Sequence, residues 1–486
     1  MIHAKLKGYL AGYLPLNLIQ ALTALGIVVI YSRLLSPEHY GRFALAVICL
    51  QWLQSLSFYW LQGGVLRFYE VNRTQGRLPA LLTTAFRSAA VLSGAIVLVT
   101  AIVLPYLDST WAWLVLAGLV NLVARAFLLI GLEAHRAARQ VQRYSLLEGT
   151  YSLLGLALGS ILVIVTGGGA ASALWGTALA GVFALAINSR NLIGMMHPSI
   201  WSSVELRELI GYGMPLAVGT LLNQIVASAD RFFVAAFIDE RAVGLYSVAY
   251  ALADRPSAII FNWVAMAALP LAFAGMANEG PSGARRVMES TAKTLILLML
   301  PSTVGLAAIA EPLAAVVVGP EYRSETALLI PWIALASLLY GLMVHYSAHA
   351  FQITRNTRAL LVSYGLVLVI NIVLNILLIP RYGLGGAVAA SMVTYGFGLA
   401  LQCAMARRFL PIPWAPSHLI RAILACCVMF AAIRAAPIPD TLSGLMLAIL
   451  LGICSYCAMA IALNVADIRR SLFTGRLSVL IDRARQ

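Results

Sequence analysis

Long apolar runs alternate with short polar segments along almost the whole chain. A helix that crosses the hydrocarbon core of a bilayer needs about 20 predominantly apolar residues. By this criterion the pattern predicts an all-α polytopic membrane protein with fourteen transmembrane helices. They are expected at residues 10–32, 42–63, 86–106, 111–132, 145–166, 170–189, 209–238, 243–270, 291–311, 326–350, 359–379, 384–405, 419–436 and 441–463.

The helices expected at 209–238 and 243–270 carry polar and charged residues inside the apolar pattern. Several of these residues recur at intervals of three or four, so they share faces of the helices. An ionisable residue within a bilayer costs a few kcal/mol to insert, and its default role is functional and interior-facing. We therefore expect a polar stripe that does not face lipid. Its members are Asn223, Gln224, Asp230, Arg231, Tyr250, Asp254 and Arg255.

Short motifs recur in the same order in two halves of the chain, as they do in transporters built from internal repeats. The matched positions are Pro15 with Pro215, Gly41 with Gly244, and Gly168 with Gly385. These matches predict parallel repeats, one six-helix bundle at 1–200 and a second at 201–410. Two extra helices follow at 411–463, and a cytoplasmic tail at 464–486.

A second set of polar residues lies in the first two predicted helices, at spacings of three or four. Amides at such spacings either line a polar, ligand-binding cavity or join neighbouring helices by hydrogen bonds. We favour the cavity, because the first two helices and those at 209–238 and 243–270 hold equivalent places in the repeats. The residues are Asn17, Gln20, Gln51, Gln54 and Ser55.

The composition supports a membrane protein, because 61% of residues are hydrophobic and 11% are charged, against about 25% charged in soluble proteins. The net charge is +14, but the basic residues lie in short loops and form no patch interleaved with aromatic residues. We therefore expect no nucleic-acid partner. The loops contain no Walker-type phosphate-binding sequence, so we expect no ATP hydrolysis, no cofactor and no metal.

The distribution of basic residues predicts the orientation in the membrane. Of 33 Lys and Arg residues, 24 fall in loops or at span ends on one side, 6 on the other, and 3 remain within the membrane. Because cytoplasmic loops carry the excess of Lys and Arg, both termini are expected in the cytoplasm. The start of the chain shows no short apolar core followed by a small-residue cleavage site, so we expect no cleavable signal.

Three arginines, Arg125, Arg231 and Arg255, lie within the predicted spans. A guanidinium stays charged and matches phosphate oxygens in a bidentate geometry, so these side chains are candidates to hold an anionic group. The alternative for Arg231 is a structural ion pair. Because neighbours in a helix do not face each other, we expect that pair to cross between helices to Asp254. Arg125 has no charged residue nearby on its own helix, and we expect it to reach the cytoplasmic surface.

Residues 32–43, SRLLSPEHYGRF, resemble the loop after the first helix of bacterial polysaccharide and O-antigen flippases. Residues 371–387 resemble the signature of helices 11 and 12 in that family. Asp230 followed by Gly244 and Tyr246 is similar to its pattern in helices 7 and 8. The resemblance extends from about residue 8 to 463 and indicates the multidrug/oligosaccharidyl-lipid/polysaccharide exporter superfamily.

The resemblance implies two six-helix bundles around a central cavity that opens to alternate sides. It implies a flippase that moves undecaprenyl-pyrophosphate-linked oligosaccharide across the bacterial inner membrane, for O-antigen or exopolysaccharide assembly. Its expected partners are membrane lipids, a polysaccharide polymerase and a chain-length regulator. We expect ion coupling through Asp254 or Asp230. Substrate contacts are expected from Arg125, Arg231, Arg255, Gln51, Gln54, Asn17, Asn223, Gln224 and Tyr250.

Three other functions are compatible with parts of this pattern. A lipid II flippase of the same superfamily also has fourteen helices and an arginine-bearing cavity. A multidrug antiporter of the superfamily typically has twelve helices and expels cations, which a cationic cavity disfavours. A membrane glycosyltransferase or polymerase is disfavoured because the chain offers no large external loop.

Overall fold

The computed structural model describes residues 2–195 and 201–469, and the side chains of 15–194 and 201–469. Within these ranges all regular secondary structure is helical, as predicted. The predicted tail at 464–486 lies outside the described residues from 470 onward. The chain divides into two compact units, residues 1–244 and 245–486. The predicted repeat boundary, after residue 200, differs from this division and stays a prediction.

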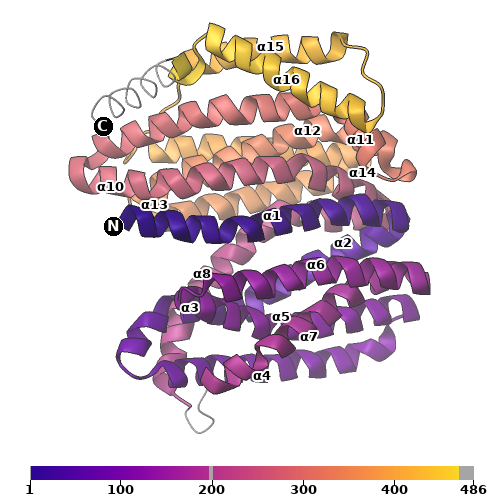
Figure 1. Ribbon diagram of the computed structural model, residues 1–486, viewed down its shortest axis with the longest axis vertical. Helices are drawn as coiled ribbons and strands as arrows, with labels where there is room; N and C mark the ends of the chain where they lie inside the picture. The colour runs from indigo at the N-terminus through magenta and orange to yellow at the C-terminus, as the bar shows by residue number, and fades with distance from the viewer. Residues whose placement is uncertain (1, 196–200, 470–486) are drawn as a thin grey trace, which may run out of the picture. The chain divides into compact units, whose positions relative to one another are not determined.

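The first unit is a bundle in which α3 packs on α8, α5 on α7, and α6 on both α1 and α7 (Figure 1). Apolar residues of α3, α4, α5 and α8 share one core. The helices of this unit in the described residues are α1 (Ile2–Leu34), α2 (Pro37–Ser57), α3 (Tyr59–Thr74), α4 (Leu78–Val103), α5 (Ser109–Ala137), α6 (Val141–Thr166), α7 (Gly169–Met195), α8 (Ser203–Ser228) and α9 (Asp230–Phe237).

Local sequence signals set several helix ends in the first unit. The hydroxyl of Ser36 accepts a hydrogen bond from the backbone N–H of His39, so Ser36 caps α2. Gly167 ends α6 in the left-handed conformation, with φ 62°, which glycine adopts at little cost. Between α2 and α3 the chain bends by 50° near Phe58, so this pair is either one broken span or a re-entrant loop.

Small residues allow α6 and α7 to approach closely. A Cβ on Gly159 would lie 2.9 Å from the carbonyl oxygen of Ala173, and a Cβ on Gly176 would overlap the backbone of Gly159. Helices in lipid associate through close packing at such small residues, because lipid supplies no hydrophobic driving force between them. The glycines therefore specify this helix pair.

The second unit contains two unusually long helices, α10 (Glu240–Ala308), which begins in the first unit, and α14 (Thr357–Ala406). Each holds one non-helical glycine, Gly280 with φ 68° and Gly383 with φ 58°. A Cβ on Gly275 would lie 2.9 Å from the carbonyl carbon of Gly283, although eight residues of straight helix span about 12 Å. The chain therefore folds back at Gly280, and α10 is a helical hairpin.

Two helices near the end of the described chain, α15 (Pro416–Ala435) and α16 (Leu442–Ala462), lie side by side (Figure 1). Their buried residues share a core with apolar residues of α10. They coincide with the pair expected after the repeats. The remaining helices described in the second unit are α11 (Ala310–Val317), α12 (Arg323–Leu342) and α13 (Ala348–Ile353). A π-helical segment, Met343–Ser347, lies between α12 and α13. Short 3-10 helices lie at Leu104–Tyr106 in the first unit and at Pro320–Tyr322 and Val465–Asp467 in the second.

Within the described ranges, eleven helices are long and apolar enough to cross a membrane, or twelve if the bent pair is one span. Their outward faces expose large apolar side chains, including Val165, Trp263 and Ile420. Soluble monomers rarely expose large contiguous apolar surfaces, whereas lipid solvates them. The prediction of an all-helical, multi-pass membrane protein is confirmed.

Candidate functional site

Arg125 on α5 makes a bidentate ion pair with Glu148 on α6. The Nη1–Oε2 and Nη2–Oε1 distances are both 2.7 Å, and the two side chains are 18% and 8% exposed. The expectation that Arg125 reaches the cytoplasmic surface is wrong, because its acidic partner lies on the neighbouring helix. Within the membrane, pairing offsets the cost of burying each charge.

Two further side chains complete this cluster. Gln20 on α1 donates from Nε2 to Oε1 of Glu148 at 3.4 Å, and the guanidinium of Arg125 lies 4.1 Å from the ring centre of Tyr151 on α6. The cluster therefore joins α1, α5 and α6. Asn17, a predicted substrate contact one turn before Gln20, is exposed.

Arg231 forms an ion pair with its neighbour in sequence, Asp230. Its Nη1 lies 2.7 Å from Oδ1 of Asp230 and also donates to the carbonyl oxygen of Ala227 at 2.9 Å. The argument that adjacent residues cannot pair is wrong here, because α8 ends at Ser228 and α9 begins at Asp230. At that break, the rule for the interior of a continuous helix does not apply. Both side chains are buried.

The predicted polar stripes of α2 and α8 meet at one hydrogen bond, from the hydroxyl of Ser55 to Oε1 of Gln224 at 2.8 Å. For this pair the structure supports helix joining rather than a cavity lining. Gln51 is exposed, whereas both amide atoms of Gln54 are buried and lack a hydrogen-bond partner in the described part of the chain. Asn223 is partly exposed.

The remaining predicted residues lie on α10 in the second unit. Tyr250 is buried against Tyr246, with 5.8 Å between the ring centres. Asp254 is partly exposed and Arg255 is exposed. Arg231 and Asp254 belong to different compact units, and the ion pair expected between them stays a prediction.

A family profile described as polysaccharide biosynthesis protein matches residues 30–327. The chain belongs to this family. The match agrees with the resemblance carried by residues 32–43. Arg125, Glu148, Asp230 and Arg231 all lie within the part of the chain that this family profile matches.

A relative and two solved structures can be aligned with most of this chain. The probable flippase AglR of Haloferax volcanii is 22% identical over 468 residues, covering 92% of this chain and 94% of that protein. A structure titled lipid II flippase MurJ, inward closed conformation, has a TM-score of 0.77 at 14% identity, covering 94% of this chain and 98% of its own. An inward-facing multidrug resistance MATE family transporter of the MOP superfamily has a TM-score of 0.63 at 16% identity, covering 80% and 94%.

These structures have the fold of this polysaccharide biosynthesis protein, an all-helical architecture shared by MurJ and MATE transporters. The family match, the relative titled a probable flippase and the shared fold are consistent with the predicted transporter. Among the described residues, no group of three or more His, Cys, Asp or Glu side chains is placed to hold a metal ion.

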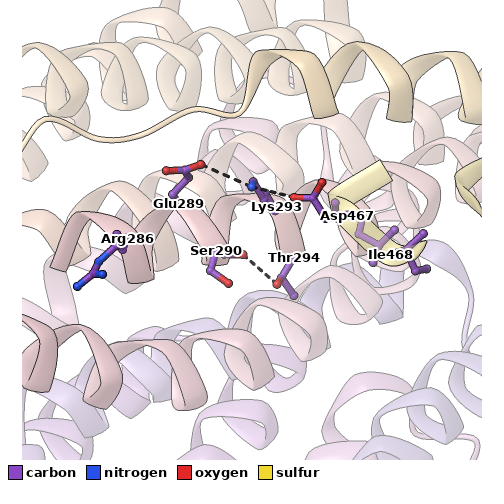
Figure 2. A pocket seen from close by; sticks show the side chains of 9 residues that line it. Arg286, Glu289, Ser290, Lys293, Thr294, Asp467 and Ile468 are labelled. Carbon is purple, nitrogen blue, oxygen red and sulfur yellow. Dashed lines mark hydrogen bonds and ion pairs between the residues drawn. The ribbon is translucent and has the colours of Figure 1, made fainter. Parts of the chain in front are cut away.

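Two cavities in this family member have polar linings that the sequence did not indicate. One, of about 500 Å³, lies in the second unit between α10 and the turn after α16 (Figure 2). There Lys293 lies between Glu289 and Asp467, with its Nζ 3.6 Å and 3.0 Å from their carboxylate oxygens (Figure 2). The other, of about 320 Å³, lies in the first unit between α3, α5 and α8.

Glu148 is the main residue that sequence reasoning missed. It is an acid within the predicted span 145–166, so the criterion that selected the three arginines would also have selected it. Gln62 and Glu133, which line the smaller cavity, gave a weaker signal because they lie near the predicted ends of spans. Gln62 on α3 and Glu133 on α5 line one cavity because α3, α5 and α8, which are distant in sequence, pack together.

Proposed function

We propose that the chain is an alternating-access flippase that moves polyprenyl-pyrophosphate-linked oligosaccharide from the cytoplasmic to the periplasmic leaflet, for O-antigen or exopolysaccharide assembly. The observation that carries this proposal is a buried arginine, Arg231, inside a membrane-spanning member of the polysaccharide biosynthesis protein family. A diphosphate must cross a region of low dielectric constant, where a guanidinium provides both counter-charge and directed hydrogen bonds.

We assign the phosphate contacts first to Arg231 and Arg255. Arg231 already holds a carboxylate, Asp230, through its Nη1, and an incoming phosphate oxygen has the same charge and acceptor chemistry. Arg125 uses both terminal nitrogen atoms on Glu148, so its first role is structural. The predicted sugar contacts are Gln51, Gln54, Asn17, Asn223, Gln224 and Tyr250.

We infer fourteen spans, with both termini in the cytoplasm of a bacterial inner membrane. The fold-back at Gly280 supports counting α10 as two spans, and the non-helical Gly383 supports the same for α14. The basic residues supply the orientation. A topology reporter placed at Gly280 should read cytoplasmic, and one placed at Glu321 should read exported. The opposite readout at either position would overturn this arrangement.

We propose that Asp254, or failing it Asp230, couples transport to an ion gradient. A membrane potential supplies about 2.3 kcal/mol per charge per 100 mV, and a titratable group in the pathway could respond to it. In vesicles, Asp254→Asn should bind substrate but lose the dependence of transport on the proton gradient. If the wild-type protein transports equally fast after the gradient collapses, neither aspartate couples transport.

A second candidate is a lipid II flippase of the same superfamily. The fold likeness to MurJ, with a TM-score of 0.77, favours it over a multidrug antiporter, for which the likeness is 0.63. Lipid II and oligosaccharide lipids both carry a diphosphate, so only a direct comparison of substrates separates these candidates.

The test is a flipping assay in vesicles that contain the purified protein. Fluorescent polyprenyl-diphosphate oligosaccharide, lipid II and a cationic dye are compared as substrates. We expect the oligosaccharide lipid to flip fastest. Arg231→Gln should abolish flipping, and Arg231→Lys should retain part of it, since lysine keeps the charge but loses the planar fork.

The matched control for this assay is Arg434→Gln, because Arg434 forms an exposed ion pair with Glu311 in the second unit. It should flip substrate at the wild-type rate. Normal flipping by Arg231→Gln would contradict a role for Arg231. Transport of the dye but not of the lipids would overturn the proposed function.

A further inference from the structure

The cavity of about 320 Å³ in the first unit is formed entirely by α3, α5 and α8. Its size falls in the range of small-molecule sites. The outer part is open, because Arg67 and Tyr212 on its lining are exposed. Six of its lining residues carry polar groups, Tyr59, Gln62, Arg67, Glu133, Arg136 and Tyr212.

Two residues on this lining each carry a buried polar atom that lacks a partner among the described residues. Nε2 of Gln62 and Oε2 of Glu133 are shielded from solvent and make no hydrogen bond within the described ranges. Gln62 is only 4% exposed. Buried polar groups are nearly always paired, and each exception calls for an explanation such as a bound ligand or water. Here one atom is a donor and the other an acceptor, and their side chains line the same cavity.

A hydroxyl group answers both requirements, because it donates one hydrogen bond and accepts others. Gln62 offers the donor Nε2 and Glu133 offers the acceptor Oε2 to such a group. A phosphate fits this part of the lining poorly, since the carboxylate of Glu133 would repel it. An apolar ligand would leave both atoms unpaired.

Groups around the hydroxyl-binding pair suit a sugar ring. Tyr59 and Tyr212 supply aromatic surfaces with polar tips, and Tyr212 packs edge-to-face on Phe68 with 5.7 Å between ring centres. Nη1 of Arg136 lies 3.5 Å from Oε1 of Glu133. This contact is long for a hydrogen bond, and the other N–H donors of Arg136 can reach ligand oxygens. Arg67 and Arg136 are also among the basic residues predicted on the cytoplasmic side.

We propose that this cavity is a carbohydrate subsite that binds one sugar residue of the substrate through Gln62 and Glu133 at the cytoplasmic side. The inference rests on the proposed function for the identity of the substrate. It assigns recognition of the sugar to the first unit, separately from the arginines that hold the diphosphate.

The direct test is sugar binding to the purified protein in nanodiscs, followed by saturation-transfer NMR. The probes are glucose, galactose, rhamnose and N-acetylglucosamine at millimolar concentration, with inorganic diphosphate as a separate arm. We expect at least one sugar to bind the wild-type protein, and Gln62→Leu or Glu133→Met to weaken that binding tenfold or more. Gln75→Leu, an identical exchange at an exposed position of the same unit, should bind like the wild type.

Folding of Gln62→Leu is checked by thermal unfolding. Because Nε2 of Gln62 has no hydrogen bond among the described residues, leucine should leave the unfolding temperature unchanged or raise it. Failure of every sugar to bind the wild type would overturn the subsite, as would equal binding to Gln62→Leu. Binding of diphosphate alone would make the cavity an anion site and would also overturn it.

A second measurement separates this inference from the proposed function. Wild-type protein should bind polyprenyl diphosphate with its oligosaccharide at least tenfold more tightly than bare polyprenyl diphosphate. Gln62→Leu should lose that preference while it still binds the bare lipid. Loss of binding to both lipids would contradict the subsite, whereas sugar binding without any flipping would contradict only the flippase function.

Discussion

Two of the arginine–glutamate clusters in the first unit, Arg125 with Glu148 and Arg136 with Glu133, differ in how completely their polar atoms are paired. Both carboxylate oxygens of Glu148 accept hydrogen bonds from Arg125 at 2.7 Å. In the other cluster Glu133 meets Arg136 at 3.5 Å, and its Oε2 has no partner among the residues described. The residue types are the same, so pairing, rather than composition, separates the closed cluster from the open one, which we propose as a ligand site.

Burial explains why the difference matters. A buried ion pair offsets the cost of desolvating its members only when the geometry is good and the remaining hydrogen bonds are made. The Arg125–Glu148 pair meets this condition, and Gln20 adds a third donor to Glu148. The cavity cluster leaves hydrogen-bonding capacity open, which a ligand can use.

The largest expected effect comes from breaking the closed cluster. Arg125→Met leaves Glu148 buried without a counter-charge and should destabilise the protein by about 3–5 kcal/mol. The measurement is thermal or denaturant unfolding of the purified protein in detergent. Arg125→Met combined with Glu148→Leu should recover most of the loss, because no buried charge remains. A double variant as unstable as the single one would contradict the pairing.

The same substitution in both clusters gives a direct comparison. Glu148→Gln should cost about 3 kcal/mol, since it leaves Arg125 as an unpaired buried charge. Glu133→Gln should cost less than about 1 kcal/mol, since Arg136 is half exposed and its contact is long. Unfolding of the two variants under identical conditions measures the difference. Equal losses would remove the distinction between a closed and an open cluster.

A neutral hydrogen bond between helices should have an intermediate effect. Ser55→Ala removes the donor to Oε1 of Gln224 and should destabilise the protein by about 1 kcal/mol. Thr220→Ala on α8 is the control, because its hydroxyl bonds only to a carbonyl of its own helix at an exposed position. A control variant that loses as much stability as Ser55→Ala would show that the contact between helices contributes nothing extra.

The smallest effect is expected at the ion pair of Lys293 and Asp467 in the second unit. The hydrogen bond from Lys293 lowers the pKa of Asp467 below its ordinary value of 3.8. The pair therefore stabilises the folded state fully above that value, and this contribution is lost as the pH falls through the lowered pKa. It should amount to less than about 1 kcal/mol, because Asp467 is 46% exposed.

The check on this pair is unfolding from pH 6 down to pH 2 in the wild type and in Asp467→Asn. The difference in stability between the two proteins should shrink toward the acidic end. A difference that stays constant with pH would show that the charge of Asp467 contributes nothing.

Much of the fold follows from the sequence because membrane insertion imposes a local rule. A run of about 20 apolar residues must cross the bilayer as a helix, since its backbone groups can be satisfied only internally. The helices expected at 111–132 and 441–463 lie within or close to α5 and α16 for this reason. The family resemblance also came from short local segments, residues 32–43, residues 371–387 and the pattern of Asp230, Gly244 and Tyr246, taken together in their order along the chain.

The partners of the polar residues required the tertiary structure. Glu148 is 23 residues from Arg125, and only the rotation of α6 against α5 brings the two side chains together. The pair of Arg231 with Asp230 depends on a helix break that hydropathy does not reveal.

The amino-acid sequence was sufficient to predict a multi-pass helical membrane protein with arginines in its spans, and to indicate its family. The packing of the helices was needed to see which arginine holds which acid, where α10 turns back at Gly280, and which buried atoms of the smaller cavity have no partner among the described residues. The two differ because hydrophobicity acts on each segment separately. Pairing depends on the facing sides of helices, which packing between distant segments sets.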